Sequence, residues 1–391
     1  MTGIASSRIA RLEATLARRD ADGLRRQRRI VAAPAGPRTI VDGVPLLAFA
    51  SNDYLGLAAD PLVIAAARDA ALAWGVGAGA SHLVSGHSAP HEALERELAT
   101  FVVPTGGVAA LLFASGYLAN LAILTVLAGR HDAIFADRLN HACLNDGALL
   151  ARATMHRYAH GDVDALARAL QASAAPGKLI VTDAVFSMDG DIAPLAALLE
   201  LAEQHDAWLV VDDAHGFGVL GEGRGTLAHL GMVSDRIVLM GTLGKAAGVA
   251  GAFVAAHPVV IDALVQTARP YIYTTAMPPL LAQARRVALG LIRDDHARRA
   301  TLHSHIARFR AGAAALRWTL LPSQTAIQPL VVGEPSAALA LSAALAAQGI
   351  WVPAIRPPTV PAGTARLRVS LSAAHSPGDV DALLAALAAA A

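Results

Sequence analysis

Short apolar runs alternate with helical patterns through the middle of the chain. The runs are almost continuously apolar and do not alternate with polar residues, so we expect strands buried on both faces of a sheet. The predicted strands are residues 110–114, 133–136, 178–181, 208–211 and 236–240. Helical patterns lie between them, for example at residues 117–128 and 194–205. This alternation predicts an α/β fold with a mostly parallel, doubly wound sheet.

The pattern changes beyond about residue 280. A helical stretch at 282–318 is followed by strand-like segments and two further helices. The strand-like segments are 327–332, 351–355 and 367–371, and the helices are 336–348 and 377–389. We therefore expect three parts: an N-terminal helix and arm at 1–50, a large domain at 51–280, and a smaller α+β domain at 281–391.

The first thirty residues are rich in arginine and resemble a mitochondrial transit peptide. However, Glu13, Asp20 and Asp22 interrupt the pattern, and transit peptides avoid acidic residues. Because Leu12, Leu16 and Leu24 recur at near-helical spacing, we expect a solvated amphipathic helix packed on the body. The uncharged segment 101–129 is long enough to span a bilayer, but prolines and glycines interrupt it, which favours a buried strand, turn and helix.

Composition narrows the possible partners and the compartment. The formal net charge is +1, so nothing in the charge balance indicates nucleic acid or an acidic membrane as a partner. The single cysteine, Cys143, cannot form an internal disulfide. This agrees with a reducing compartment, and we expect a cytoplasmic protein.

One lysine stands out chemically. Lys245 lies in the glycine-rich turn 241–248, directly after a predicted buried strand. Glycines let the backbone bend closely around a ligand, and a partly desolvated lysine can condense with an aldehyde. An ordinary loop lysine is the competing interpretation of this segment.

An acidic residue and a histidine follow another predicted strand. Asp212 ends the strand and His215 lies one turn further on. A carboxylate there can keep a pyridinium nitrogen protonated, which makes the ring a better acceptor of negative charge. A helix cap or a metal site are the alternatives, and metal ranks low because no third ligand stands at metal spacing nearby.

Further polar groups lie at the ends of predicted strands. The turn from Ser115 through Gly116 to Tyr117 leads into a helix, whose free backbone amides favour a phosphate. His141 could stack on an aromatic ring, and Ser187 offers a hydroxyl. Arg368 could bind a carboxylate with two parallel hydrogen bonds. Taken together, these groups favour pyridoxal phosphate. The glycines at 75–79 follow a helical pattern instead of a strand, which argues against a nicotinamide cofactor.

Over nearly its whole length the chain resembles the α-oxoamine synthases, fold-type I enzymes that depend on pyridoxal phosphate. The resemblance is carried by SNDYLG at 51–56, VDDAHG at 211–216, GTLGK at 241–245 and YTTAMPP at 273–279. The stretch 355–368 and the residues 326–330 favour the branch that condenses L-alanine with a pimeloyl thioester, releasing carbon dioxide. CoA and an acyl-carrier protein both remain open as the thioester carrier.

The resemblance also implies roles for individual residues. Lys245 would hold the cofactor covalently, Asp212 would pair with its ring nitrogen, and His141 would stack on the ring. The other cofactor contacts would be Gly116, Tyr117, Ser187, His215 and Thr242. Thr274 and Thr275 match a segment that reaches the neighbouring subunit's phosphate, which implies a homodimer with shared sites. Asn52 and Arg368 would hold the amino-acid carboxylate, and Arg25 and Thr359 would lie near the acyl substrate, with His141 also facing substrate.

Alternatives remain within and outside this family. Members that use glycine, namely 5-aminolevulinate synthase and glycine C-acetyltransferase, are the runners-up, followed by serine palmitoyltransferase. A non-catalytic subunit with the same fold is disfavoured because Lys245 is retained. Asp183 and Ala184 depart from the family pattern, and His82 and His87 lie in a variable stretch.

Overall fold

The structure is a computed structural model that describes residues 3–26 and 28–390. Its largest part is built on a seven-stranded sheet with the order β3-β9-β8-β7-β6-β4-β5. The strands are β3 Ala109–Phe113, β4 Ala133–Asp137, β5 Thr154–Tyr158, β6 Lys178–Asp183, β7 Trp208–Asp212, β8 Ile237–Thr242 and β9 Ala252–Ala256. Only β9 runs against its neighbours, β3 and β8. The predicted strands and the mostly parallel sheet are therefore confirmed.

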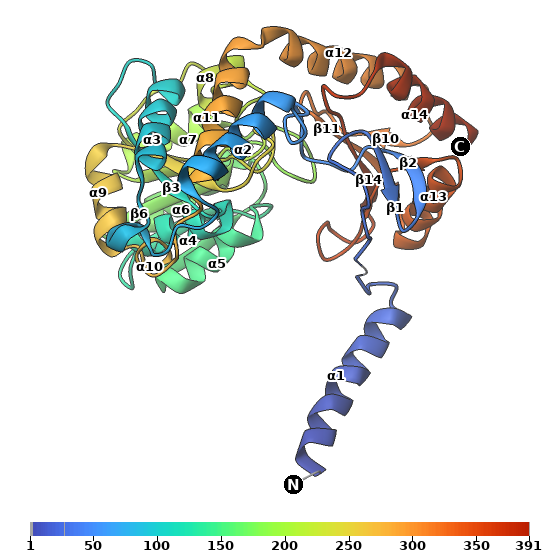
Figure 1. The fold of residues 1–391 in the computed structure, drawn as a ribbon. Helices are drawn as coiled ribbons and strands as arrows, with labels where there is room; N and C mark the ends of the chain where they lie inside the picture. Colours follow the sequence, from blue (N-terminus) through green and yellow to red (C-terminus); the bar gives the residue numbers. More distant parts are fainter. Residues whose placement is uncertain (1–2, 27, 391) are drawn as a thin grey trace.

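Both faces of this sheet are covered by helices, as the continuous apolar runs predicted (Figure 1). Leu209 and Val211 of β7 join one apolar cluster, whereas Val210 joins the other. One face is covered by α4 Gly116–Leu127, α5 Ala142–Ala151 and α9 Pro258–Thr267. The other is covered by α3 Ala89–Val102, α6 Val163–Ala172, α7 Leu195–Gln204 and α11 Pro279–Asp294. Shorter or peripheral elements are α2 Pro61–Trp74, the π-helix η1 His82–Gly86, the 3-10 turn η2 Gly221–Gly223, α8 Thr226–His229 and α10 Arg269–Ile272.

The C-terminal part is a smaller α+β unit, as predicted. Its antiparallel sheet has the order β10-β11-β14-β13, with β10 Thr319–Leu320, β11 Ile327–Gly333, β13 Ala354–Ile355 and β14 Ala365–Ser370. The helices of this part are α12 His296–Ala313, α13 Pro335–Ala347 and α14 Pro377–Ala389. A three-stranded sheet joins β1 Arg38–Val41 and β2 Val44–Ala48 to β12 Ile350–Trp351.

Two long segments are divided where one element was expected. The helical stretch at 282–318 contains α11 and α12, because Asp295 accepts a hydrogen bond from Arg298 N at 3.0 Å and caps a new helix. The strand expected at 351–355 is divided between β12 and β13, which belong to different sheets. Helix α11 lies almost wholly beyond the predicted boundary at residue 280, yet it packs against α2 and α3 of the large domain. The domain boundaries themselves stay a prediction.

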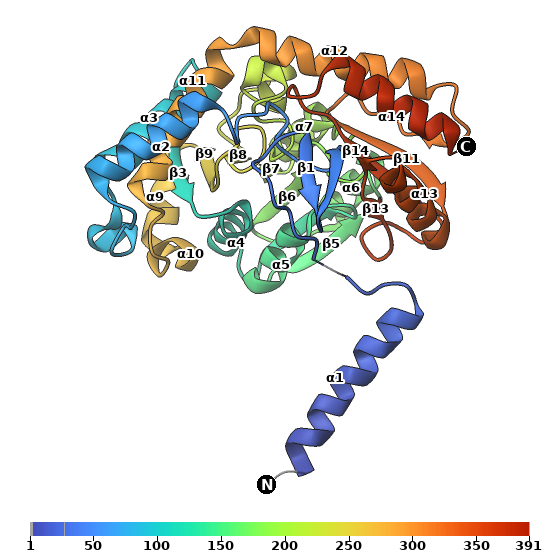
Figure 2. The ribbon, with the colours of Figure 1, turned by 45° about the vertical axis from the view of Figure 1, so that its right-hand side comes forward.

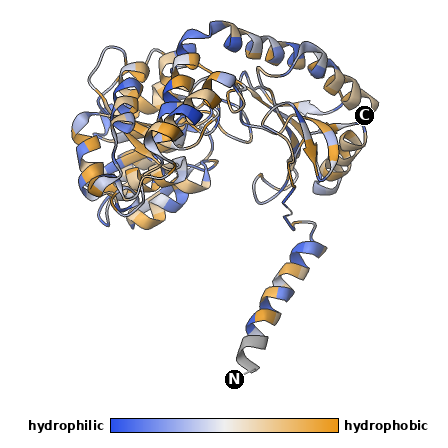
Figure 3. Cartoon of the chain, viewed as in Figure 1, coloured by the Kyte–Doolittle hydropathy of each residue, from blue (hydrophilic) through white to orange (hydrophobic). Residues whose placement is uncertain are grey.

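The N-terminal helix does not pack on the body, and this part of the prediction is wrong. The helix forms as α1 Gly3–Ala21, but it projects away from the rest of the chain in both views (Figures 1 and 2). Hydrophobic and hydrophilic residues alternate along it (Figure 3). Its apolar side chains Ile9, Leu12 and Leu16 are 57%, 66% and 45% exposed, because no surface of the same chain covers them. Among the described residues, no helix is long and apolar enough to cross a membrane.

Candidate active site

The predicted catalytic residues gather at one edge of the seven-stranded sheet. Strands β3, β4, β6, β7 and β8 all run in the same direction, so their carboxyl ends share that edge. Asp212 ends β7, Lys245 follows β8 and His141 follows β4. Open α/β sheets bind their ligands at this edge, because the loops after the strands converge there.

Lys245 is held by a chain of buried hydrogen-bonding side chains. Its Nζ lies 2.9 Å from His215 Nε2, and His215 Nδ1 lies 2.7 Å from the hydroxyl of Tyr54. Tyr54 is fully buried and comes from the segment before α2, far from Lys245 in the sequence. The aminomethylene end of the lysine is therefore oriented by groups from three separate loops.

Burial shapes the protonation of this chain. It lowers the pKa of Lys245, although the carboxylates of Asp212 and Asp183 act in the opposite direction. Burial also lowers the pKa of His215 well below its ordinary value, and the neighbouring Lys245 adds to that shift. A lysine with a lowered pKa has more of its amine in the uncharged form, which is the form that attacks an aldehyde and accepts a proton.

Asp212 is positioned by an asparagine from the opposite side of the sheet edge. Asn120 of α4 donates from Nδ2 to Asp212 Oδ2 at 2.7 Å, and Ala214 N donates to Asp212 Oδ1 at 3.0 Å. Asn120 is fully buried, and its Oδ1 has no partner among the described residues. Nearby, burial raises the pKa of Asp183 well above its ordinary value, and the charge of Asp212 raises it further.

Arg368 and Asn52 lie together beside the lysine network. Arg368 Nη1 donates to Asn52 Oδ1 at 3.2 Å, and its Nη2 donates to the Tyr54 hydroxyl at 3.4 Å. The Nε group donates to the backbone oxygen of Ser187 at 2.6 Å. Because Arg368 is 5% exposed and held on three sides, its guanidinium has a fixed orientation next to Lys245 and His215.

The predicted phosphate turn has the required backbone. The side chain of Ser115 accepts from Leu118 N at 3.3 Å and caps α4, so Gly116 and Tyr117 form its first turn. The first N–H groups of a helix have no partner within it and favour an anion. Across the sheet edge, Thr242 accepts from Gly244 N at 3.2 Å and donates to Gly251 O at 3.1 Å, which fixes the lysine turn.

His141 lies at the rim of the site, where the residue is exposed in part. It caps α5, and its backbone N donates to Asp183 Oδ2 at 2.8 Å. Its Nδ1 lies 2.8 Å from the sulfur of Cys143. Burial lowers the pKa of His141, so the ring has a greater uncharged fraction than an ordinary histidine at the same pH. Pinned at its backbone and Nδ1, it keeps a face free for an aromatic ligand.

Arg25 and Thr359 occupy a separate place at the surface. Arg25 pairs with Asp20 at 2.5 Å and is exposed. Its neighbours Leu24 and Arg26 line a hollow of about 200 Å³ together with the loop that carries Thr359. Arg356 of that loop donates to the backbone oxygen of Gly23. The structure thus brings the two predicted acyl-site segments to each other, and not to Lys245.

Thr274 and Thr275 also lie apart from the lysine network. Thr275 pairs with Ser81 in an isolated β-bridge, and Ala276 N donates to Ala80 O at 3.0 Å. The segment therefore follows the turn around η1. Among the described residues, neither threonine is hydrogen-bonded to Lys245, Asp212 or His141.

The residues at the sheet edge fit pyridoxal phosphate. They supply an amine with a lowered pKa, a buried carboxylate, an imidazole with a free face and a helix N-terminus, each at the end of a different strand. The unpartnered Oδ1 of Asn120 leaves one buried acceptor beside Asp212. Sequence reasoning did not assign roles to Tyr54, Asn120 or Cys143. The only signal for them was their presence in segments that flank the site.

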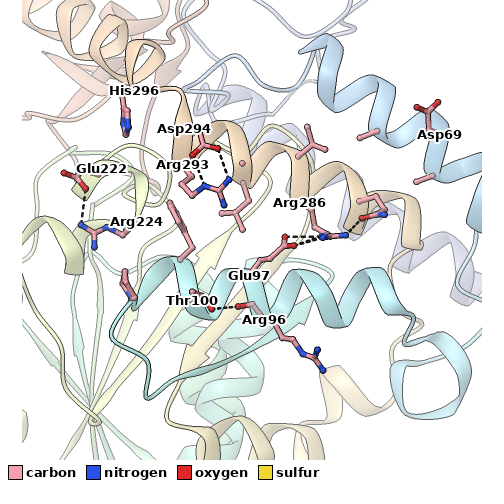
Figure 4. Close-up of a pocket in the computed structure, with 18 of the residues that line it drawn as sticks. Asp69, Arg96, Glu97, Thr100, Glu222, Arg224, Arg286, Arg293, Asp294 and His296 are labelled. Atoms are coloured by element: carbon pink, nitrogen blue, oxygen red, sulfur yellow. Dashed lines mark hydrogen bonds and ion pairs between the residues drawn. The ribbon is translucent and has the colours of Figure 1, made fainter.

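A large cavity elsewhere in the described chain is a different site. It measures about 1210 Å³ and lies between α2, α3, α11 and the loop at η2 (Figure 4). Its arginines are paired with acids: Arg286 with Glu97 at 2.6 Å, and Arg293 with Asp294 at 2.8 Å. None of the predicted site residues lines it. Because its positive charges are already neutralised, it has little attraction for an anionic substrate.

Comparison with known proteins adds independent evidence. Residues 44–387 match the model of the aminotransferase class I and II family. An 8-amino-7-oxononanoate synthase from Herminiimonas arsenicoxydans is 62% identical over 374 residues, covering 94% of this chain and 96% of the relative. A second protein of that name, from Polaromonas naphthalenivorans, is 60% identical, covering 95% of each chain.

Solved structures match over similar lengths. Serine palmitoyltransferase from Sphingomonas wittichii has a TM-score of 0.90 and 31% identity, covering 100% of this chain and 98% of that one. A variant of serine palmitoyltransferase from S. paucimobilis, solved with pyridoxal phosphate and myriocin, has a TM-score of 0.91 and 30% identity, covering 98% and 97%. An 8-amino-7-oxononanoate synthase from Francisella tularensis has a TM-score of 0.75 and 30% identity, covering 88% and 97%.

Proposed function

Because the chain belongs to the 8-amino-7-oxononanoate synthases of the class I and II aminotransferase family, enzymes of acyltransferase type with pyridoxal phosphate as cofactor, we propose that it condenses L-alanine with a pimeloyl thioester. The products are 8-amino-7-oxononanoate, carbon dioxide and the free thiol carrier, and the step belongs to biotin biosynthesis. The buried Lys245–His215–Tyr54–Arg368 network carries this proposal.

Sequence identity favours alanine over serine as the amino acid. Serine palmitoyltransferase from Sphingomonas wittichii is 31% identical to this chain, about half the 62% of the 8-amino-7-oxononanoate synthase from Herminiimonas arsenicoxydans. A shared fold tolerates different substrates, whereas the residues of a pocket decide between them. The proline-rich stretch 355–368 and the residues 326–330 support the alanine branch.

The chain's own groups divide the chemistry among them. When bound, pyridoxal phosphate supplies an aldehyde that takes up the amino acid and a ring that accepts negative charge from it. Lys245 holds the cofactor before the substrate arrives, and its uncharged Nζ then removes the α-proton of alanine. His215 Nε2, 2.9 Å from Nζ, keeps the amine pointed at that proton. After carbon dioxide leaves, Lys245 returns a proton to the same carbon.

Asp212 and His141 hold the ring in this proposal. The carboxylate of Asp212, fixed by Asn120 at 2.7 Å, holds a proton on the ring nitrogen. His141 stacks against the ring with its exposed face. Ser187 and His215 bond polar groups of the ring, and Gly116, Tyr117 and Thr242 surround the phosphate. Asp212, His141 and Thr242 are each held by a neighbouring group, so these residues need little motion when the ligand binds.

Arg368 and Asn52 hold the carboxylate of alanine. The guanidinium is buried and fixed beside Lys245, which places the amino acid's α-carbon near Nζ. This orientation serves the condensation because the α-proton must face the base. It also serves the later loss of carbon dioxide, because the bond that breaks is the one to the held carboxylate.

The hollow between residues 24–26 and the Thr359 loop is a candidate contact for the acyl chain. Arg26 and Arg356 line a space of about 200 Å³ and supply positive charge there, and Arg25 is next to Arg26 in the chain. A pimeloyl chain ends in a carboxylate, which such a group would bind. The phosphates of CoA would be attracted by the same charges, so a test must separate the two.

A homodimer with shared sites completes the proposal. Leu83, Val84 and Tyr273 are 51%, 78% and 71% exposed, and they lie in the two segments joined by the bridge between Ser81 and Thr275. Apolar side chains exposed together favour a protein interface. Across that interface, Thr274 and Thr275 would reach the phosphate bound by the partner.

A substrate panel tests the proposal. Purified holoenzyme is given alanine, glycine or serine with pimeloyl, acetyl, succinyl or palmitoyl thioesters, and released thiol and product mass are measured. We expect the highest kcat/KM for alanine with the pimeloyl thioester. A missing methyl group costs about 1–3 kcal/mol, so glycine should react about 5- to 150-fold more slowly. Preference for glycine with acetyl-CoA or succinyl-CoA would leave the family intact and overturn the proposed substrates.

A further inference from the structure

A cluster of histidine and glutamate side chains lies at the start of α3, outside the active site. Among the described residues, two groups have ligand atoms that all lie within 4.8 Å of one another. The groups are His82, His87 and His91, and His87, Glu92 and Glu95. His87 belongs to both groups, so a metal ion bound by its imidazole would be shared with either the two histidines or the two glutamates.

The first group is already used for structure. His91 Nδ1 accepts from Ser88 N at 3.1 Å and lies 2.8 Å from the Ser88 hydroxyl, which forms a capping box at the start of α3. Its Nε2 lies 2.8 Å from Met277 O. With both ring nitrogens occupied, His91 is a structural histidine that ties α3 to the segment after Thr275.

In the second group, each side chain is anchored by one atom and points another toward a common centre. Glu92 Oε1 pairs with Arg96 at 2.7 Å, while Glu92 Oε2 lies 3.3 Å from His87 Nε2. Glu95 Oε1 accepts from Leu112 N at 2.9 Å, while Glu95 Oε2 lies 4.0 Å from His87 Nε2. Glu92 and Glu95 are three residues apart on α3 and therefore share a face.

The imidazole of His87 is oriented in the same way. Its Nδ1 lies 3.0 Å from His82 Nδ1, and the His82 ring stacks on Tyr271 with centroids 5.0 Å apart. When His87 donates its Nδ1–H to His82, the lone pair of Nε2 faces the two carboxylates. These three groups can be joined either by a proton on His87 Nε2 or by a metal cation, and an outer partner on the second nitrogen is typical of histidine ligands.

We propose that His87, Glu92 and Glu95 bind a divalent transition-metal ion of the zinc or manganese type. The imidazole suits Zn²⁺ and the two carboxylates suit both Zn²⁺ and Mn²⁺, and water completes the coordination. The site is reachable, because the Glu92 side chain is 47% exposed, while Glu95 at 12% closes its inner side. Arg96, Leu112 N and His82 form the outer shell.

The metal would stiffen the turn beneath the threonine segment. Residues 82–87 follow Ser81, which bridges to Thr275, and His91 bonds Met277 O. An ion that joins His87 to α3 therefore fixes the base on which Thr274 and Thr275 are held. Its role is structural, and it takes no part in the chemistry at Lys245.

Metal binding to the holoenzyme tests this inference. Protein stripped with a chelator is dialysed against Zn²⁺ or Mn²⁺, and bound metal is measured by mass spectrometry together with the melting temperature. The variants are His87→Gln, Glu95→Gln and His82→Gln. Matched controls are His131→Gln and Glu203→Gln, which change exposed residues elsewhere on the chain. Circular dichroism confirms that each variant folds.

We expect about one ion per wild-type and control chain, with a raised melting temperature, as for other three-ligand protein sites. His87→Gln and Glu95→Gln should lose the ion, and His82→Gln should weaken its binding about 10- to 100-fold, as an outer-shell partner does. Hydrogen exchange of residues 273–277 should slow with metal in wild type and in the two control variants, and not in His87→Gln or Glu95→Gln. Equal binding by His87→Gln, or no binding by folded wild type, would overturn the proposal.

Discussion

The lysine network and the threonine segment differ in how complete they are within one chain. Around Lys245, each functional side chain has partners from the same chain, such as His215 at 2.9 Å for the lysine and Asn120 at 2.7 Å for Asp212. Around Thr274 and Thr275, the structure supplies a bridge to Ser81 and an exposed Tyr273. The region around Lys245 is thus complete within one chain. The region around Thr274 and Thr275 instead exposes hydroxyl groups and apolar surface.

In the proposed homodimer, this difference corresponds to a division of roles between the two copies of the chain. Groups that must be exact to a fraction of an ångström are preorganised inside one fold, because misplacement of a base or carboxylate costs rate directly. Groups that only complete the phosphate contacts can come from a partner. The projecting helix α1, with its exposed apolar residues, is a second feature with no covering surface in its own chain.

The largest loss of activity is expected when the amine of Lys245 is removed. We expect Lys245→Ala to lower turnover by about 10⁴-fold or more, since general-base catalysis alone contributes up to about that factor. The visible absorbance that the bound cofactor owes to Lys245 should also disappear. Spectra and product formation after addition of pyridoxal phosphate measure both, and near-normal turnover would mean that another group is the base.

Asp212 and Asp213, which are adjacent at the end of β7, test which side chains belong to the active site. We expect Asp212→Asn to reduce activity about 100- to 1,000-fold, as loss of one preorganised electrostatic group does. Asp213 faces away from the site and accepts from Thr226 N at 2.7 Å and from its hydroxyl at 2.6 Å. Asp213→Asn should therefore retain most activity. Equal losses in the two variants would contradict the assignment of Asp212 to the ring.

The same aspartate gives a pH test of stability. Burial raises the pKa of Asp213 to about 7, above its ordinary value of 3.8. The folded state thus binds this proton more tightly than the unfolded state, and the stability it contributes is lost as pH rises from about 4 to 7. The melting temperature of Asp213→Asn relative to wild type should rise over this window. A difference that is independent of pH would contradict the buried, protonatable carboxyl.

A smaller effect is expected from the tyrosine that links the base to the carboxylate site. Tyr54→Phe removes the hydroxyl 2.7 Å from His215 Nδ1 and leaves the ring in place. One hydrogen bond contributes about 0.5–1.5 kcal/mol, so kcat should fall about 2- to 12-fold. The Tyr54 hydroxyl also accepts from Arg368, whose charge lowers the pKa of Lys245, so the pH profile of kcat should also move. An unchanged profile with an equal rate would make Tyr54 a packing residue.

The smallest effect should come from the surface. Arg25 is exposed and paired with Asp20, and exposed ion pairs contribute about 0.2–1 kcal/mol. Arg25→Ala should lower kcat/KM for the pimeloyl thioester about two- to fivefold and leave its uncharged methyl ester unaffected. If both donors lose rate equally, the helix end binds the phosphates of CoA and not the distal carboxylate.

The sequence predicted what depends on local pattern. Continuous apolar runs located the central strands, and strand-end positions located Lys245, Asp212 and His215, because parallel strands bring their ends to one edge whatever their order. The partners that orient these groups could not be found in this way. Asn120 is 92 residues from Asp212, and Tyr54 is 161 residues from His215. Their approach depends on strand order and loop packing.

For the N-terminal helix, the sequence predicted the element but not what it packs against. Its apolar spacing correctly predicted a helix, yet the helix projects from the rest of the chain and its apolar residues stay exposed (Figure 2). An amphipathic pattern shows that one face is to be buried, and it does not show against what. The boundary between α11 and α12 was missed for a related reason, since Asp295 caps a helix inside a segment whose composition is helical throughout.

A mixed dimer tests the central claim most directly. A Lys245→Ala chain is combined with a Thr274→Ala, Thr275→Ala chain, each carrying a different tag, and heterodimers are isolated by both tags. If sites are shared, one site of the heterodimer keeps an intact lysine and receives intact threonines from its partner, so activity should return to about half that of wild type. If each chain builds its site alone, the isolated heterodimer should be no more active than the average of its two parents, and the division of labour would be contradicted.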